Sequence, residues 1–127
     1  MERPNFTAVK LQSSNITDCE QFFGHVFGFE VTHRYGGEPG ASFAEIVMTL
    51  RGEKGMMLKF IQTGDEPVSA TGTTIQIALS EIEPTLATAL AAKATLVMAP
   101  TEYPEAGVRM AVISTDQGLG IELVQDL

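Results

Sequence analysis

Short stretches in which apolar and polar residues alternate run along most of the chain, as they do in strands with one buried face. The alternation predicts strands over residues 6–12, 29–35, 42–50, 56–62, 74–79, 95–103, 107–114 and 120–125. Turn-forming residues connect several of these strands, as in 36–40 and 51–55. Residues 63–73 have the composition of a longer loop.

A helical period replaces the alternation from about residue 15 to residue 27. Its apolar stripe is formed by Cys19, Phe23, Val26 and Phe27. Asn15 is one candidate for the N-cap, and Thr17 with Glu20 has the spacing of a capping box. Gly28 follows the stripe and is expected to end the helix.

A second helical stretch follows Ser80. Ser80 and Glu83 again have capping-box spacing, and Pro84 is tolerated in the first turn. The residues expected to face inward are Leu86, Ala89 and Leu90. This helix is therefore predicted to pack on the strands around it.

The order of these elements indicates an internal repeat. Ser14-Asn15-Ile16 and Ser80-Glu81-Ile82 each open a helix that has one strand before it and three after it. The plan is βαβββ twice, an α+β fold, with repeat one at about 6–63 and repeat two at about 73–126 of one domain, 1–127. Because one such unit cannot bury its apolar face alone, the two are expected to pack together around a ligand.

Two segments carry a family resemblance. Phe22-Phe23 with Val26-Phe27-Gly28-Phe29-Glu30-Val31 is similar to the pattern FY…LGFEV, and residues 116–125 are similar to DPDGNPIELVQ. Together they resemble the vicinal oxygen chelate superfamily, which includes glyoxalases, bleomycin-resistance proteins and extradiol dioxygenases. The resemblance implies a curved eight-stranded cup with both helices on the convex face, and a homodimer.

The resemblance also implies where a metal would be held. Enzymes of this superfamily bind a divalent metal through four side chains, one from the opening strand and one from the last strand of each repeat. The matching positions here are Ala8, Lys59, Thr74 and Glu122. Only the last is a ligand type, and an alignment shifted by one residue offers Val9 and Ile75 instead. We therefore expect no divalent metal and no other cofactor.

The ligand-binding residues predicted from the same plan lie on strands: Ala8, Lys10, Met57, Lys59, Thr74, Gln76, Arg109 and Glu122. Glu122 is the tentative catalytic residue, as an acceptor or weak base. We expect an ion pair or a water-bridged contact between Lys59 and Glu122, because a lone carboxylate in a cup is costly to desolvate.

Several other residues have two possible roles. Arg109 and Tyr103 either clamp a ligand or form an ordinary cross-strand pair. Glu45 interrupts an apolar strand and is equally compatible with a pocket or a surface position, and His33 is more compatible with the surface. Methionines in or beside strands can line a pocket or fill the core: Met48, Met56, Met57, Met98 and Met110.

Composition limits the possible partners. The chain has 127 residues and a formal net charge of −8, which argues against nucleic acid or an anionic membrane as partner. The single cysteine, Cys19, excludes an internal disulfide and suits a reducing cytoplasm. No apolar run follows the charged N-terminus, and none is long enough to span a bilayer.

The leading hypothesis is a metal-independent binder or enzyme that takes a small molecule, in the manner of the antibiotic-binding resistance proteins. The alternative is a metal-dependent lyase, isomerase or dioxygenase whose ligands have moved, for example to Glu45 or His33. A third possibility is a structural or regulatory module whose cup is filled by side chains. The residues alone do not identify the ligand.

Overall fold

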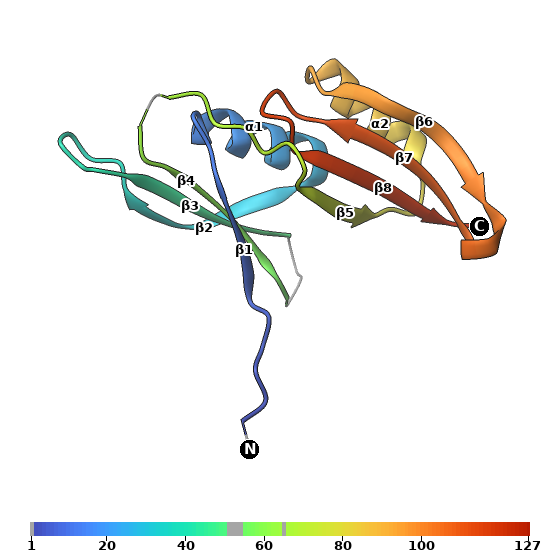
Figure 1. Ribbon diagram of the computed structural model, residues 1–127, viewed down its shortest axis with the longest axis horizontal. Helices are drawn as coiled ribbons and strands as arrows, with labels where there is room; N and C mark the ends of the chain where they lie inside the picture. The colour runs from blue at the N-terminus through green and yellow to red at the C-terminus, as the bar shows by residue number, and fades with distance from the viewer. Residues whose placement is uncertain (1, 51–54, 65) are drawn as a thin grey trace. The chain divides into compact units, whose positions relative to one another are not determined.

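The computed structural model describes residues 2–50, 55–64 and 66–127, and the chain divides into two compact units, Met1–Val68 and Ser69–Leu127 (Figure 1). The division falls inside the segment 63–73 that the sequence indicates as a loop. Residues 51–54 of the predicted 51–55 connection lie outside the described residues. Each unit is treated below by itself.

The first unit contains one helix and a four-stranded sheet in the order β1-β4-β3-β2. Its elements are β1 (Ala8–Gln12), α1 (Ile16–Phe27), β2 (Phe29–Gly36), β3 (Ala44–Leu50) and β4 (Met57–Gln62). The β1–β4 pair is parallel, and the other neighbours are antiparallel. β1 begins two residues later than predicted: the Phe6 side chain is 74% exposed and lies before the strand.

The second unit repeats this plan, with a four-stranded sheet in the order β5-β8-β7-β6. Its elements are β5 (Thr74–Ala78), α2 (Ile82–Ala91), β6 (Thr95–Tyr103), the short 3-10 helix η1 (Pro104–Ala106), β7 (Val108–Ser114) and β8 (Gly120–Asp126). Again only the pair of first and last strands, β5 and β8, is parallel. The predicted α+β fold with two βαβββ repeats is confirmed. No helix in the described ranges is long and apolar enough to cross a membrane.

Each helix packs on one face of the sheet in its own unit. The Phe23 ring of α1 lies 5.2 Å from that of Phe60 on β4 and 5.7 Å from that of Phe29 on β2, centroid to centroid. On α2 the buried residues are Ile82, Leu86 and Ala89. The expectation that Leu90 faces inward is wrong: it is exposed, because it follows Ala89 by about 100° around the helix.

The helix starts differ from each other. Asn15 caps α1, because its side chain accepts a hydrogen bond from the Asp18 amide at 3.1 Å, and Gly28 ends that helix at φ 81° as predicted. The predicted Ser80/Glu83 capping box of α2 is wrong. The N-cap of α2 is Glu81, and its side chain makes no capping hydrogen bond.

A glutamine from the last strand of each unit holds the first amide of that unit's helix. The Ile16 amide donates to Gln62 Oε1 at 3.1 Å, and the Ile82 amide donates to Gln125 Oε1 at 2.9 Å. The first amides of a helix have no partner inside the helix, so this contact satisfies one of them and fixes the helix to β4 or β8. The same device therefore occurs at equivalent places in both repeats.

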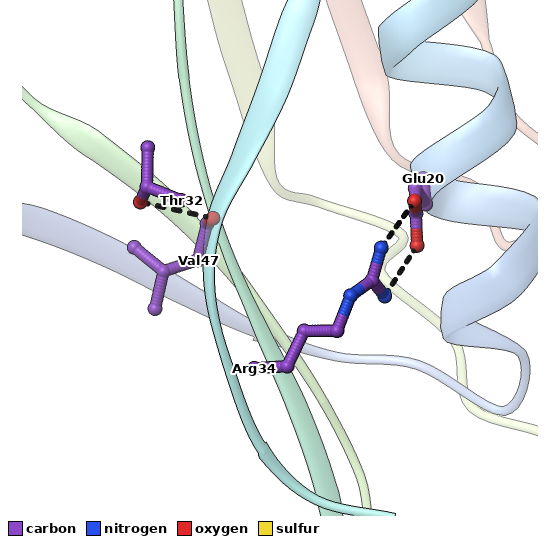
Figure 2. A network of polar contacts seen from close by, with 4 residues as sticks. All are labelled: Glu20, Thr32, Arg34 and Val47. Atoms are coloured by element: carbon purple, nitrogen blue, oxygen red, sulfur yellow. Dashed lines mark hydrogen bonds and ion pairs between the residues drawn. The ribbon is translucent and has the colours of Figure 1, made fainter.

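A bulge in β2 decides which way its later residues point. Met48 faces Val31, but its neighbour Val47 faces His33, so Thr32 is an extra residue. The Thr32 hydroxyl donates to the Val47 carbonyl at 3.4 Å, and beyond the bulge Arg34 turns toward Glu20 on α1 (Figure 2). β6 has the same shift between Leu96 and Met98, and a second one before Thr101.

We predict that Gln125→Leu and Gln62→Leu each lower the free energy of unfolding by about 1–3 kcal/mol, because each leaves a helix-terminal amide without an acceptor. Gln125→Glu and Gln62→Glu are the matched controls, since a carboxylate can still accept that bond. Urea denaturation at neutral pH measures all four. A leucine variant as stable as its glutamate control would contradict this role.

A second prediction concerns the ion pair that Arg34 makes with Glu20 through two hydrogen bonds of 2.8 and 2.7 Å. The hydrogen bond from Arg34 lowers the pKa of Glu20 below its ordinary value of 4.5. The stabilisation is therefore complete above pH 4.5 and is lost as the pH falls through the lowered value. Because the pair is largely exposed, Arg34→Gln should cost about 0.2–1 kcal/mol at pH 7.

The cost of Arg34→Gln should shrink as the pH is lowered from 7 to 2, because Glu20 is protonated as the pH falls through its lowered pKa. Glu20→Gln is the control, and adding Arg34→Gln to it should cost nothing further at pH 7. A stability difference between wild type and Arg34→Gln that is the same at pH 7 and pH 2 would show that the ion pair is not its source.

Candidate functional site

Strand alternation gives each sheet a face covered by its helix and a face opposite, which we call the open face. Leu58 and Phe60 on β4, and Ile121 and Leu123 on β8, are buried on the helix side. The residues between them, including Lys59 and Glu122, therefore lie on the open faces. The residues of each open face are identified from the pairing of neighbouring strands within one unit.

The open face of the first sheet carries a row of directly paired residues across its four strands: Lys10 on β1, Lys59 on β4, Val47 on β3 and His33 on β2. Two lysines are thus neighbours on a parallel strand pair. The next row contains Gln12, Ile61, Glu45 and Tyr35. The candidate polar groups of this unit gather in these two rows.

Glu45 is the buried charge of this face. Its side chain is 9% exposed, and one oxygen, Oε1, accepts a hydrogen bond from Lys10 Nζ at 3.0 Å. Lys10 is 49% exposed, and from β1 it reaches across β4 to the carboxylate on β3. A buried carboxylate is costly without a counter-charge, so Lys10 compensates Glu45. Glu45 therefore has a structural partner on the open face.

His33 and Tyr35 lie side by side at the β2 end of these rows. Their ring centroids are 6.1 Å apart and the ring planes differ by 2°, which is a stacked arrangement. The bulge at Thr32 brings both rings to the open face, because without it His33 would point to the helix side. Both side chains are exposed.

The second sheet has the equivalent row with different chemistry: Gln76 on β5, Glu122 on β8, Val112 on β7 and Met98 on β6. Glu122 occupies the place of Lys59. The Tyr103 hydroxyl lies 3.3 Å from the Met98 sulfur. Where the first open face has two lysines, the second has an amide and a carboxylate, so the two faces differ in the sign of their charge.

Most of the predicted ligand-binding residues lie on open faces, with Ala8 and Met57 paired on the first sheet and Thr74 opposite Gly120 on the second. Arg109 is the exception. It pairs in register with Gln125 on the helix side and forms an ion pair with Glu83 of α2. Arg109 therefore lies on the face opposite Glu122, and we leave it out of the site.

The register of Arg109 also decides the expected pair with Tyr103. Its partner on β6 in register is Glu102, so the cross-strand pair with Tyr103 is wrong. The pKa of Glu83 is lowered, first by a hydrogen bond from the Glu83 backbone amide and then by the Arg109 side chain.

Met48 fills the core, while Met57, Met98 and Met110 occupy open-face register positions.

Sequence reasoning missed the contact between Lys10 and Glu45 and the stacked pair of His33 and Tyr35. A signal existed for Glu45, the one carboxylate inside an apolar strand pattern. None existed for the bulge that reorients His33. The predicted contact between Lys59 and Glu122 joins the two units and stays a prediction.

The donors at the superfamily's metal positions do not fit a divalent cation. Ala8 has no donor, Thr74 is a rare ligand, and Lys59 carries a positive charge itself. Among the described residues, no group of three or more His, Cys, Asp or Glu side chains is placed to hold a metal ion. We derive no step that needs a metal.

No protein-family model matches the chain, and no curated protein matches it in sequence. Similarity to solved structures is clear. Glyoxalase I from Zea mays matches over 93% of this chain with a TM-score of 0.78 and 12% identity. The match covers 44% of the maize chain, so this chain spans less than half the length of that enzyme.

Two shorter proteins match over their whole length. TioX from Micromonospora sp. ML1 has a TM-score of 0.69 and 22% identity, covering 98% of this chain and 100% of its own. TnmS3, an antibiotic binding protein from Streptomyces sp. CB03234, has a TM-score of 0.71 and 15% identity, covering 100% and 99%. The chain has the vicinal oxygen chelate fold. The resemblance drawn from residues 22–31 and 116–125 is thereby confirmed for the fold.

The ion pair on the open face of the first sheet leads to a prediction about Lys10. Lys10→Met should lower the free energy of unfolding by about 1–3 kcal/mol, less than for a fully buried pair, because it leaves the Glu45 carboxylate alone. Adding Glu45→Gln should recover part of that loss. Lys93→Met, at an exposed lysine in the second unit, is the control. A double variant less stable than Lys10→Met would contradict the pairing.

Proposed function

We propose that this protein binds a small organic molecule on the open faces of its sheets and does so without a divalent metal. The fold supports binding, because one protein that shares it over the full length is an antibiotic binding protein. Fold alone does not determine function, and the residues of the open faces supply the further support for small-molecule binding.

One observation carries the metal-independent part of the proposal. At the position where the superfamily places a metal ligand in the first repeat, Lys59 is paired directly with Lys10 across parallel strands. Lys10 is compensated by Glu45 at 3.0 Å, so it is the Lys59 ammonium that repels a divalent cation and attracts an anionic or strongly polar oxygen. The same position therefore favours a ligand oxygen over a metal.

The other open-face residues suit the same function. Gln76 and Glu122 are neighbours in register and offer a hydrogen-bond donor and acceptors, with Glu122 also available as a weak base. Met57, Met98 and Met110 supply flexible apolar surface. Apolar surface with a few orienting polar groups is typical of small-molecule sites.

The second candidate is a metal-dependent lyase, isomerase or dioxygenase with relocated ligands. The two residues that sequence reasoning offered for it are engaged otherwise: Glu45 with Lys10, and His33 in a stack on Tyr35. These contacts favour the metal-independent proposal. The third candidate, a module without a ligand, differs from both in having no saturable binding.

We also propose a cytoplasmic homodimer. Val97, at the bulge of edge strand β6, is 63% exposed, and a second copy covering such an edge would remove apolar surface from water. The single cysteine, Cys19, is buried, and a chain with one cysteine has no internal disulfide, which is compatible with a reducing compartment.

The test is thermal denaturation against a panel of aromatic and polyketide-like compounds in buffer containing EDTA. A ligand at about 100 times its dissociation constant should add about 2.7 kcal/mol to the free energy of unfolding. The variant Lys59→Met with Glu122→Gln should lose the shift, and Lys93→Met should keep it. Stabilisation only after a divalent metal is added would support the second candidate, and none under either condition would support the third.

A further inference from the structure

On the first open face the lysines Lys10 and Lys59 are matched in number by the carboxylates Glu45 and Glu30, but neither carboxylate lies in the row of Lys59. Glu45 accepts from Lys10 at 3.0 Å, and within the described part of the first unit no carboxylate lies within ion-pair distance of Lys59. Lys59 is half-buried between β1 and β3. An ammonium that is half-buried and has no carboxylate in its own row gains from an external anion.

The opposite end of the same row carries flat aromatic surface. His33 lies two strands from Lys59, about 10 Å between backbones, and stacks on Tyr35 with planes 2° apart. Tyr35 is 51% exposed, so ring surface is available to a ligand. Between the two ends, in the same row, lies the apolar residue Val47.

We propose that this open face recognises a planar aromatic anion, a carboxylate or a phenolate. The anionic oxygen accepts hydrogen bonds from Lys59, and the ring packs against His33 and Tyr35. A two-ring aromatic acid is long enough to join both ends of the row. This inference rests on the proposed function and narrows it to a ligand class.

The geometry also explains why a lysine and not a metal serves here. A carboxylate bound to an ammonium keeps its charge compensated in a partly desolvated site. A neutral isostere of the same shape would pack equally well on the rings but would leave the Lys59 charge without a partner. Charge, and not shape alone, should therefore decide affinity on this face.

The experiment is isothermal titration of the full chain, in buffer with EDTA, with 2-naphthoate and with its neutral isostere 2-naphthamide. We expect naphthoate to bind at least about 10-fold more tightly, since a hydrogen bond to a charged group is lost with the amide. Lys59→Met and Lys59→Gln should remove the preference. Tyr35→Leu should weaken both compounds, and Lys93→Met should change neither.

Equal affinity of wild type for the two probes, or a preference that survives in both Lys59 variants, would overturn the inference. Two variants at Lys59 are used so that one misfolded protein does not decide the result, and circular dichroism reports their folding. If panel compounds stabilise the protein but naphthoate does not bind, the ligand class is wrong and the proposed function stands. If nothing binds, both fail.

Discussion

The hydrogen-bonded register of the strand pairs is the constraint on which the rest of this structure depends. Side chains alternate between the two faces of a sheet, so a shift of one residue would move Lys59 from the open face into the core against α1. The register in each unit is fixed by a parallel pair of first and last strands. Gln62 and Gln125 then fix the start of each helix to those same last strands.

Bulges change the alternation of side chains at particular places in the edge strands β2 and β6. The extra residue Thr32 reverses the alternation in β2, so that Arg34 can reach Glu20 on the helix while His33 and Tyr35 face away from it. The same shift after Leu96 in β6 shows that the bulge belongs to the repeated unit. In β2 the inserted Thr32 therefore serves both stability and the composition of the open face.

The sequence was sufficient for the fold because its signals are local and occur twice. Alternation located every strand within about two residues, and Gly28 marked the end of the first helix. The Ser80/Glu83 box failed because the acceptor for the helix amide, Gln125, comes from a strand far along the chain. A hydrogen bond between residues that are far apart in the chain cannot be recognised from a short sequence motif.

The candidate site was predictable only in part, for the same reason. Matching Lys59 to Glu122 by repeat position agrees with their equivalent places in the two sheets. The partner of Glu45 depends on a side chain that crosses a strand, and the orientation of His33 depends on a bulge. Neither the contact of Glu45 nor the orientation of His33 produces a periodic pattern in the sequence.

By the resemblance to the vicinal oxygen chelate superfamily, Lys59 stands where a metal ligand is expected, and we propose that this protein binds no divalent metal. Titration of chelator-treated, dialysed protein with Zn²⁺, Ni²⁺ and Mn²⁺ tests it most directly. We expect no saturable one-to-one binding in the micromolar range for any of the three. Stoichiometric binding of one metal per chain, weakened by Glu122→Gln, would contradict it.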